Sequence, residues 1–450
     1  MAEREMIVLA ARTIPDAPGL PVLRNAVDLF NDPYAFLVRS FLTVGPVFRA
    51  DGVIRNYVCL AGPQANWFLS HGGEALLDQR PLYRHLPREL RSEHYPISMV
   101  GEAHHHMRRE LMDAFSRSMM MAYSRRMADT AERVADQLPV GRKLRVLDMM
   151  HRFVGDEFGM ALANHPIGAD LDAVRSFARV SIGSGLGAYP RVTLRVIPGY
   201  QTWKRQTMAL LAQVVAEHRD SAAGSGRERD FIDVLLEGHD ENGQPFSDAD
   251  VMANGQMVFT NAMLYGGPAA SFLLYGLLKN REARERVLAE VEGDHPLTLD
   301  VVEKLPALRG AVLESLRLWP IALATPRVAK ETFDFEGYRI EAGTALLIAG
   351  SVCHALPEYF PEPEKFDIDR YAPPRNEHLQ AGSPYVPFGI GLHACVAQDV
   401  IELMMAITVG TLLRRLVVEL EPPDYVLHRV VNPFPEPESR FAIRLKARPN

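Results

Sequence analysis

From Val251 to Leu278 the chain carries no charged side chain. A segment of this length could cross a lipid bilayer, which takes about 20 apolar residues. However, it contains Asn254, Gln256 and a Gly266-Gly267-Pro268 break, which favour a helix buried inside a protein. A helix from Asp248 to Asn280 would be about 50 Å long at ~1.5 Å per residue. Because only a large and mainly helical domain can bury such a helix, this segment constrains the fold more than any other.

Hydrophobic periodicity extends the helical pattern to both sides of this segment. Apolar residues recur at helical spacing from about Glu102 onward, and a further helix is predicted over Pro306–Trp319. Short β-like pieces are restricted to Val47–Ala50, Tyr57–Leu60 and Thr332–Ile348. The pattern therefore predicts a mainly α protein with a small β portion. Because no linker or repeat interrupts it, we expect one domain over residues 1–450.

Composition excludes several classes of function. The 450 residues are 47% hydrophobic and 23% charged, which is ordinary for a globular protein and excludes a disordered chain. The net charge of −7 argues against a nucleic-acid binder, which usually carries a basic excess. Three cysteines are too few for a disulfide scaffold and indicate a reducing compartment. The apolar stretch Met6–Ala11 is too short for a signal peptide or a membrane anchor, so we expect a cytoplasmic protein.

The most specific motif precedes a predicted helix that ends near Leu413. It reads Pro-Phe-Gly-Ile-Gly-Leu-His-Ala-Cys and runs from Pro387 to Cys395. The two glycines permit a tight loop with positive φ angles. A cysteine beside a helix N-terminus is favoured as a thiolate by the free amides and the helix dipole. The alternative is an inert buried cysteine, the commonest fate of a lone one, but that explains neither the glycines nor the loop.

This motif resembles the heme-ligand loop of the cytochrome P-450 superfamily, Phe-Gly-x-Gly-x-His-x-Cys, and the similarity extends over about residues 14–446. The resemblance implies the fold of that superfamily and heme b (iron protoporphyrin IX) as cofactor. In the heme-ligand loop, residues 387–397, it implies that Cys395 is the axial iron ligand and that Phe388 packs near it. Where the superfamily usually has Gly, this chain has Ala397. We therefore expect the following helix to approach the heme slightly less closely.

A second pair of motifs lies upstream of the cysteine loop. Glu314 and Arg317 are three residues apart and so share a helix face, and Arg370 follows in a proline-rich segment. This arrangement resembles the Glu-x-x-Arg helix and the meander of the superfamily. The resemblance implies that the three side chains form a buried, hydrogen-bonded triad with a structural role.

Heme-propionate contacts are also implied by the resemblance. Three adjacent histidines begin at His104, but on a helix they point about 100° apart and cannot converge on one metal ion. His104 and Arg108 share a face and match the superfamily's heme-contacting helix. Arg327 and His393 match its other propionate contacts. Buried propionates need such charge-assisted partners; the alternative is that these are surface charges of a helix.

The long uncharged helix departs from the pattern of the superfamily. Its acid–threonine pair, which relays protons to dioxygen, would fall at Leu264 and Tyr265 in one register or at Ala269 and Ala270 in another. Neither register contains such a pair. Pro268 has no N–H, so we expect the Leu264 carbonyl to lose its helical partner and the helix to kink. We assign the distal groove, with a backbone role, to six consecutive positions: Leu264, Tyr265, Gly266, Gly267, Pro268 and Ala269.

The resemblance implies an oxidoreductase, a monooxygenase that inserts oxygen from O2 into a small organic molecule of terpenoid, polyketide or fatty-acid type. Electrons would come from a ferredoxin with its reductase or from a flavin reductase. We expect the substrate to be walled by Arg80–Val100, Val180–Val192, Tyr265–Ala270, Ile321–Thr325 and the loop around Phe434. Because the proton relay is missing, two alternatives stay open: a peroxide-dependent or rearranging enzyme, and a heme protein without catalysis. Related peroxygenases place Arg before the helix proline, where this chain has Gly.

Overall fold

The computed structural model describes residues 12–19, 25–51, 55–185, 193–221, 227–431 and 434–448. Two segments discussed above fall outside this part of the chain. They are the apolar stretch Met6–Ala11 and the second half of the expected wall Val180–Val192.

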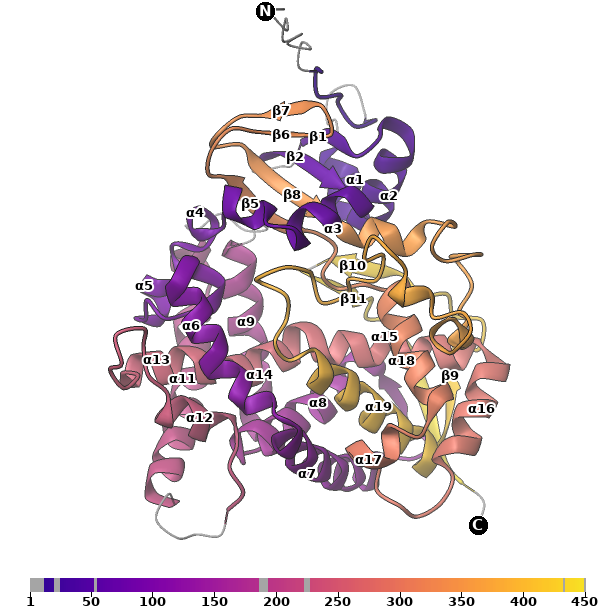
Figure 1. Cartoon of the computed structure of the whole chain (residues 1–450). Coiled ribbons are helices and arrows are strands. Elements are labelled where there is room, and N and C mark those ends of the chain that lie inside the picture. The colour runs from indigo at the N-terminus through magenta and orange to yellow at the C-terminus, as the bar shows by residue number, and fades with distance from the viewer. Residues whose placement is uncertain are drawn as a thin grey trace, which may run out of the picture.

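The uncharged segment forms a long helical run through the helical body (Figure 1). It begins at a capping box in which Ser247 and Asp250 satisfy each other's backbone amides. Its four parts are α13 (Asp248–Gly255), α14 (Met257–Asn261), the π turn η5 (Ala262–Gly266) and α15 (Gly267–Lys279). By length and apolarity the run could cross a membrane, but 83% of its most apolar window is buried inside the protein. The predicted buried helix is therefore confirmed, and its apolar side chains serve the core.

The other helices pack around this run, with α7, α8 and α19 forming the largest contacts of the body. The predicted helix over Pro306–Trp319 is confirmed, because Pro306 begins α18 and Trp319 caps its end. The bounds of these helices are α1 (Ala26–Asn31), α2 (Pro33–Val44), α3 (Pro63–Ser70), α4 (Arg80–Tyr83), α5 (Leu86–Leu90), α6 (Gly101–Met112), α7 (Arg117–Asp136), α8 (Val146–Ala163), α9 (Leu171–Gly185), α10 (Thr193–Val196), α11 (Tyr200–Ser221), α12 (Phe231–Glu237), α16 (Arg281–Val291), α17 (Leu299–Val302), α18 (Pro306–Leu318) and α19 (Gln398–Arg415).

The strands form one larger and three small sheets, so a mainly α fold with a small β portion is confirmed. The strands are β1 (Val47–Asp51), β2 (Asn56–Ala61), β3 (Leu77–Asp78), β4 (Lys143–Arg145), β5 (Thr325–Ala329), β6 (Phe333–Phe335), β7 (Tyr338–Ile340), β8 (Ala345–Ala349), β9 (Leu416–Leu420), β10 (Arg429–Val431), β11 (Pro435–Pro437) and β12 (Ala442–Ala447). The larger sheet has the order β1-β2-β8-β5-β3, and β2 and β8 run parallel with Leu60 opposite Ile348. It stands at one end of the helical body (Figure 1).

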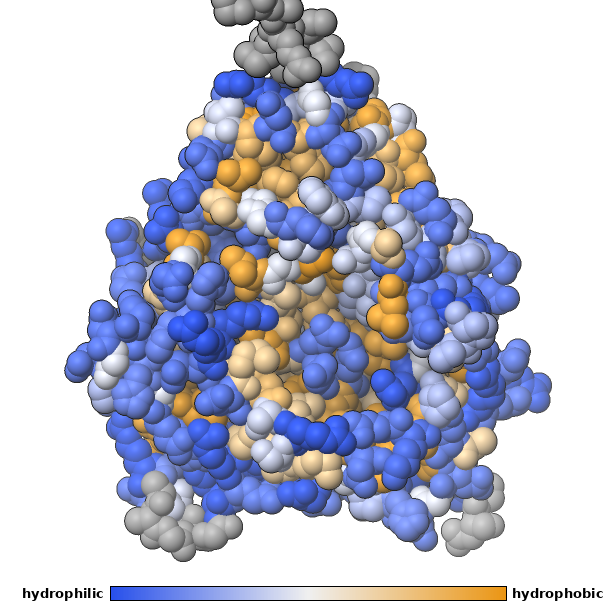
Figure 2. Space-filling view, viewed as in Figure 1, coloured by the Kyte–Doolittle hydropathy of each residue, from blue (hydrophilic) through white to orange (hydrophobic). Residues whose placement is uncertain are grey.

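Between the sheet end and the helical end, the surface is hollowed. Figure 2 shows apolar residues exposed in a depression in the middle of this face, surrounded by hydrophilic side chains. In the same view of Figure 1, the loop that precedes α19 crosses this region between α6 and α19. The fold therefore brings the cysteine loop, the helix with the three histidines and the long buried run to one place.

Candidate functional site

The cysteine loop is a tight turn that ends at a helix. Gly389 and Gly391 adopt φ angles of +75° and +83°, which only glycine adopts without strain. The loop closes on itself, because the Cys395 amide donates to the Phe388 carbonyl over 3.0 Å. Ala397 is the N-cap of α19, and its amide donates to the Cys395 thiol.

Burial decides the protonation of this thiol. It raises the pKa of Cys395, and the amide of Ala397 and the charge of Arg108 counteract it only in part. The helix terminus thus favours the thiolate, as the sequence indicates, but does not by itself offset burial. A coordinated metal cation would, because it removes the thiol proton outright.

The four predicted propionate contacts lie together beside the loop. The rings of His104 and His393 face each other with centroids 3.9 Å apart, and Arg108 donates to the Ala394 carbonyl over 2.6 Å. Burial lowers the pKa of His104 to about 4, and neighbouring Arg108 lowers it further. Burial likewise lowers the pKa of His393 to about 2, and Arg327 contributes to the shift. The cluster is thus a buried concentration of positive charge and imidazole donors.

Two polar residues that the sequence did not single out complete this cluster. Glu74, in the short helix η1 (Gly73–Leu76), is buried, pairs with Arg327 over 3.2 Å and accepts the amide of Leu392. Gln79 lies within 2.9 Å of the His393 ring. Neither residue belongs to a recognisable motif, and both reach the loop only because β3 pairs with β5.

The residues present fit heme b. A thiol at a helix N-terminus suits iron, and the surplus of cationic and imidazole groups suits two propionates, for which Glu74 supplies only part of the counter-charge. If heme is bound, Cys395 would hold the iron, and His104, Arg108, Arg327 and His393 would hold the propionates.

Above the thiol lies a cavity of about 310 Å³. Cys395, Phe388 and His393 line it on one side, and Tyr265 and Ala269 of the long helix line it on the other. Apolar side chains from α6, α8, α12, α18 and the segments that directly follow α6 and α18 supply most of the remaining wall: Leu111, Phe115, Phe158, Leu162, Phe231, Leu316 and Ile321. The cavity thus combines one reactive thiol with a largely apolar surface.

The six positions assigned to the distal groove do not all face this cavity. Tyr265 and Ala269 do, whereas Gly266 and Gly267 face α8, where an added Cβ would meet Val154 and His151 within 2.6 Å. Pro268 has no N–H, but in the register of the π turn its missing amide would have faced the Met263 carbonyl, not the Leu264 carbonyl as the sequence suggested. A π turn occupies residues 262–266, next to the predicted kink.

The predicted walls are only partly realised in the described residues. Ile321 lines the cavity, and Phe434 packs on Tyr265 with ring centroids 4.6 Å apart. Within the part of the chain that the structure describes, no residue of Arg80–Val100 lines this cavity. That segment reaches the long helix through Tyr95, whose hydroxyl accepts from the Gln256 amide over 3.2 Å.

The structure brings Glu314, Arg317 and Arg370 together, and all three side chains are buried. The Glu314 carboxylate accepts from Arg317 at 2.7 and 2.8 Å and from Arg370 at 3.1 Å. The group extends to the cysteine loop through His354. Arg317 donates to the His354 carbonyl over 2.7 Å, and the His354 ring accepts the amide of Val386, one residue before the loop, over 2.9 Å.

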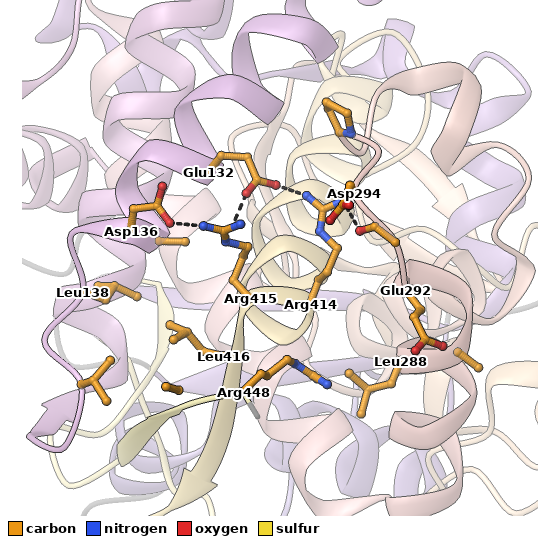
Figure 3. Close-up of a pocket in the computed structure, with 16 residues that line it drawn as sticks. Glu132, Asp136, Leu138, Leu288, Glu292, Asp294, Arg414, Arg415, Leu416 and Arg448 are labelled. Atoms are coloured by element: carbon orange, nitrogen blue, oxygen red, sulfur yellow. Dashed lines mark hydrogen bonds and ion pairs between the residues drawn. The ribbon is translucent and has the colours of Figure 1, made fainter. Parts of the chain in front are cut away.

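A larger cavity, about 1050 Å³, lies away from the thiol at the far ends of α7 and α19 (Figure 3). Its charged residues largely satisfy one another: Arg415 pairs with Glu132 and Asp136, and Arg414 reaches Glu132 and the carbonyls of the loop after α16. Because its charges are already paired and it lies away from the thiol, this larger cavity is not the reaction site.

Comparison with known proteins agrees with this geometry. The cyclooctat-9-en-7-ol 5-monooxygenase of Streptomyces melanosporofaciens is 28% identical over 329 residues, 70% of each chain. The sterol 14alpha-demethylase of Mycobacterium bovis is 24% identical over 408 residues, 87% of this chain and 89% of that protein. The structure of the cyanobacterial protein CYP120A1 with retinoic acid bound has a TM-score of 0.83 at 22% identity and covers 98% of this chain and 100% of its own.

The family model for cytochrome P-450 matches residues 14–436, nearly the whole chain. With the thiol loop, the cationic cluster and the apolar cavity in place, this match shows that the chain belongs to the cytochrome P-450 family of heme-thiolate monooxygenases.

Proposed function

We propose that this enzyme oxidises a lipophilic small molecule of terpenoid, polyketide or fatty-acid type that carries a hydroxyl, carboxylate or amide close to the oxidised carbon. Electrons come from an external ferredoxin or flavin partner, and the reaction takes place in the cytoplasm. The observation that carries this proposal is the composition of the cavity beside Cys395, which is apolar except for Cys395, His393 and two polar side chains of the long helix, Asn261 and Tyr265.

The apolar wall of this cavity would border both the porphyrin, which Cys395 and His393 would hold there, and the lipophilic part of the substrate. Burying hydrocarbon against side chains such as Phe158 and Leu162 contributes about 25 cal/mol per Å² of surface removed from water. The names of the similar proteins support this class, because they mention an alcohol, a sterol and retinoic acid, each a large hydrocarbon with one hydroxyl or carboxyl group.

The polar part of the substrate is inferred from what the helix lacks. When bound, heme activates dioxygen, a reaction that consumes protons. The hydroxyls of Thr260 and Ser271 donate to carbonyls of their own helix, over 3.0 and 2.7 Å, and so are not free to relay protons. Asn261 and Tyr265 are the polar side chains of this helix that line the cavity.

Tyr265 is suited to hold a proton in this place. Burial raises the pKa of its phenol well above the usual range, so the hydroxyl stays protonated. Within the described residues the hydroxyl has no hydrogen-bond partner, which leaves it available to water or to a substrate oxygen. We therefore assign proton delivery to Tyr265, to water beside it in the cavity and to the polar group of the substrate.

The test uses the purified holoprotein and matched ligand pairs, each an alcohol or carboxylic acid and the hydrocarbon that lacks the group. Binding is measured by the Soret shift, and turnover is measured with ferredoxin, its reductase and NADPH. We expect the polar member to shift the band and to be oxidised with little peroxide. Tight coupling with the bare hydrocarbon would exclude proton delivery by the substrate.

A parallel reaction with hydrogen peroxide in place of the electron donors separates the remaining alternative. We expect little product, since no arginine lines the cavity within the described residues. Equal turnover with peroxide would favour a peroxide-dependent enzyme.

A further inference from the structure

The helix α8 packs against the π turn of the long helix, where Gly266 and Gly267 face its residues Val154 and His151. His151 of α8 is fully buried there, and its Nε2 lies 3.0 Å from the Met263 carbonyl oxygen. No motif points to this histidine, and the reaction described above does not use it.

The backbone explains why the Met263 carbonyl needs a donor. In the π turn the Gly267 amide donates to Ala262, five residues back, instead of to Met263. In this register the next amide, that of residue 268, would donate to Met263. Residue 268 is proline and has no N–H. A buried carbonyl without a partner costs about 1–3 kcal/mol, so another group has to supply the hydrogen bond.

Gly267 makes room for that group. A Cβ on Gly267 would lie 2.4 Å from Cδ2 of the His151 ring, which no real side chain tolerates. The ring therefore packs directly on the backbone of the turn. Gly267 leaves room for the ring, Pro268 leaves the Met263 carbonyl without an amide donor, and the His151 ring supplies the donor instead.

The protonation of the ring is fixed by its surroundings. A carbonyl oxygen only accepts, so Nε2 carries the proton. Burial, aided by the charge of Arg175, lowers the pKa of His151 to about 3. The ring is therefore neutral throughout the physiological range, and the hydrogen bond does not depend on pH there.

The opposite face of the same turn lines the cavity through Tyr265 and Ala269. We propose that His151 is a positioning residue that replaces the amide missing at Pro268, holds the π turn in shape and thereby fixes where Tyr265 lies above Cys395. The contact between His151 and Met263 does not depend on the proposed function. Only its effect on the reaction rests on the proposed role of Tyr265.

Two substitutions of His151 separate the hydrogen bond from packing. His151→Gln places an N–H where Nε2 lies, whereas His151→Leu fills the space without a donor. The readout is amide hydrogen exchange at Gly266, Gly267 and Ala269 in substrate-free holoprotein. We expect exchange about tenfold faster in His151→Leu and nearly unchanged in His151→Gln.

The decisive variant restores the missing amide. In His151→Leu/Pro268→Ala the backbone again has a donor, so exchange should return to within about threefold of the wild type. Pro268→Ala alone is the reference. Unchanged exchange in His151→Leu, or no rescue by Pro268→Ala, would overturn the proposal. If neither Leu variant folds, His151 serves packing only and the proposal is equally wrong.

The effect on the reaction can be measured on the same proteins as the share of electrons lost to peroxide. Peroxide released per NADPH should rise in His151→Leu and fall again in the double variant, while the reduced carbon monoxide spectrum stays that of a thiolate ligand in all of them. Rescue of exchange without any change in peroxide would leave the contact in place but refute its effect on Tyr265. Because exchange needs no substrate, this test is independent of whether the proposed substrate class is right.

Discussion

Two buried histidines, one beside the cysteine loop and one beside the long helix, form opposite kinds of hydrogen bond with the backbone. His354 accepts the backbone amide of Val386, whereas His151 donates to the backbone carbonyl of Met263. Burial lowers the pKa of both rings to about 3, so both are neutral. They differ in which nitrogen carries the proton, and in each case the neighbouring backbone dictates it.

The cysteine loop and the long helix are held in place by different kinds of interaction. On the thiol side, His354 belongs to a network of buried charges that starts at Glu314. On the opposite side, the long helix has no ion pair near the π turn among the described residues and relies on one backbone contact and close packing. Removing a residue from the charged side should therefore mainly destabilise the protein, whereas changes on the other side should mainly alter the reaction.

The largest effect is expected from Cys395→Ser. Serine is a weak iron ligand, so the thiolate-type Soret band of the reduced carbon monoxide complex and all turnover should disappear. The control is Cys59→Ala, whose side chain lies in the sheet core. A surviving thiolate band in Cys395→Ser would show that another residue binds the iron.

Next comes Glu314→Ala. Arg317 loses its carboxylate partner and Arg370 keeps only Glu377, which costs on the order of 3–5 kcal/mol. We expect little soluble, heme-loaded protein and a large fall in the unfolding temperature. Glu285→Ala is the control, because its pair with Arg281 is exposed and contributes little to stability. A well-folded Glu314→Ala enzyme that is only slower would contradict the contrast between the two sides.

His354→Leu tests the link between that network and the loop. It strands the Val386 amide, so we expect a loss of about 1–3 kcal/mol in the free energy of unfolding. Thermal unfolding of the holoprotein measures it, with the exposed His71→Leu as control. A loss no larger than that of His71→Leu would mean that the loop does not depend on His354.

Tyr265→Phe should leave stability almost unchanged, because the ring still packs on Phe434. The proton donor is lost, so the share of electrons diverted to peroxide should rise, by a few-fold if Tyr265 supplies the proton. Tyr275→Phe, farther along the same helix, removes a hydroxyl that accepts from the Leu427 amide and should not affect coupling. Equal coupling in both variants would mean that water and the substrate deliver the proton without Tyr265.

The smallest effect is expected at the surface. Arg109 is exposed on α6, one residue after Arg108, which points to the loop. If an acidic electron donor docks here, Arg109→Glu should slow reduction a few-fold at low salt and flatten its salt dependence. Arg117 is less suited to this role, because it already pairs with Glu303. The rate with Arg281→Glu on α16 provides the baseline, and an equal rate at low salt would exclude this docking site.

Much of the fold and of the thiol side could be predicted from the sequence. The uncharged run predicted a long buried helix, and the Gly-flanked cysteine and the Glu314–Arg317 spacing resembled known motifs. These signals are local: a helix period, a turn that needs glycine, or two charges on one helix face. Glu74, Gln79 and His354 could not be predicted, because their partners lie far away in the chain.

On the distal side, too, one part could be predicted from the sequence and another part could not. The sequence by itself determined that Pro268 deprives the helix of an amide, since that follows from the covalent structure of proline. Only the tertiary structure decided which carbonyl lost its donor, that Gly267 faces α8 and that His151 supplies the missing hydrogen bond. The reason is physical: a buried polar group must find a partner, but which partner it finds depends on the elements that packing brings within 3 Å.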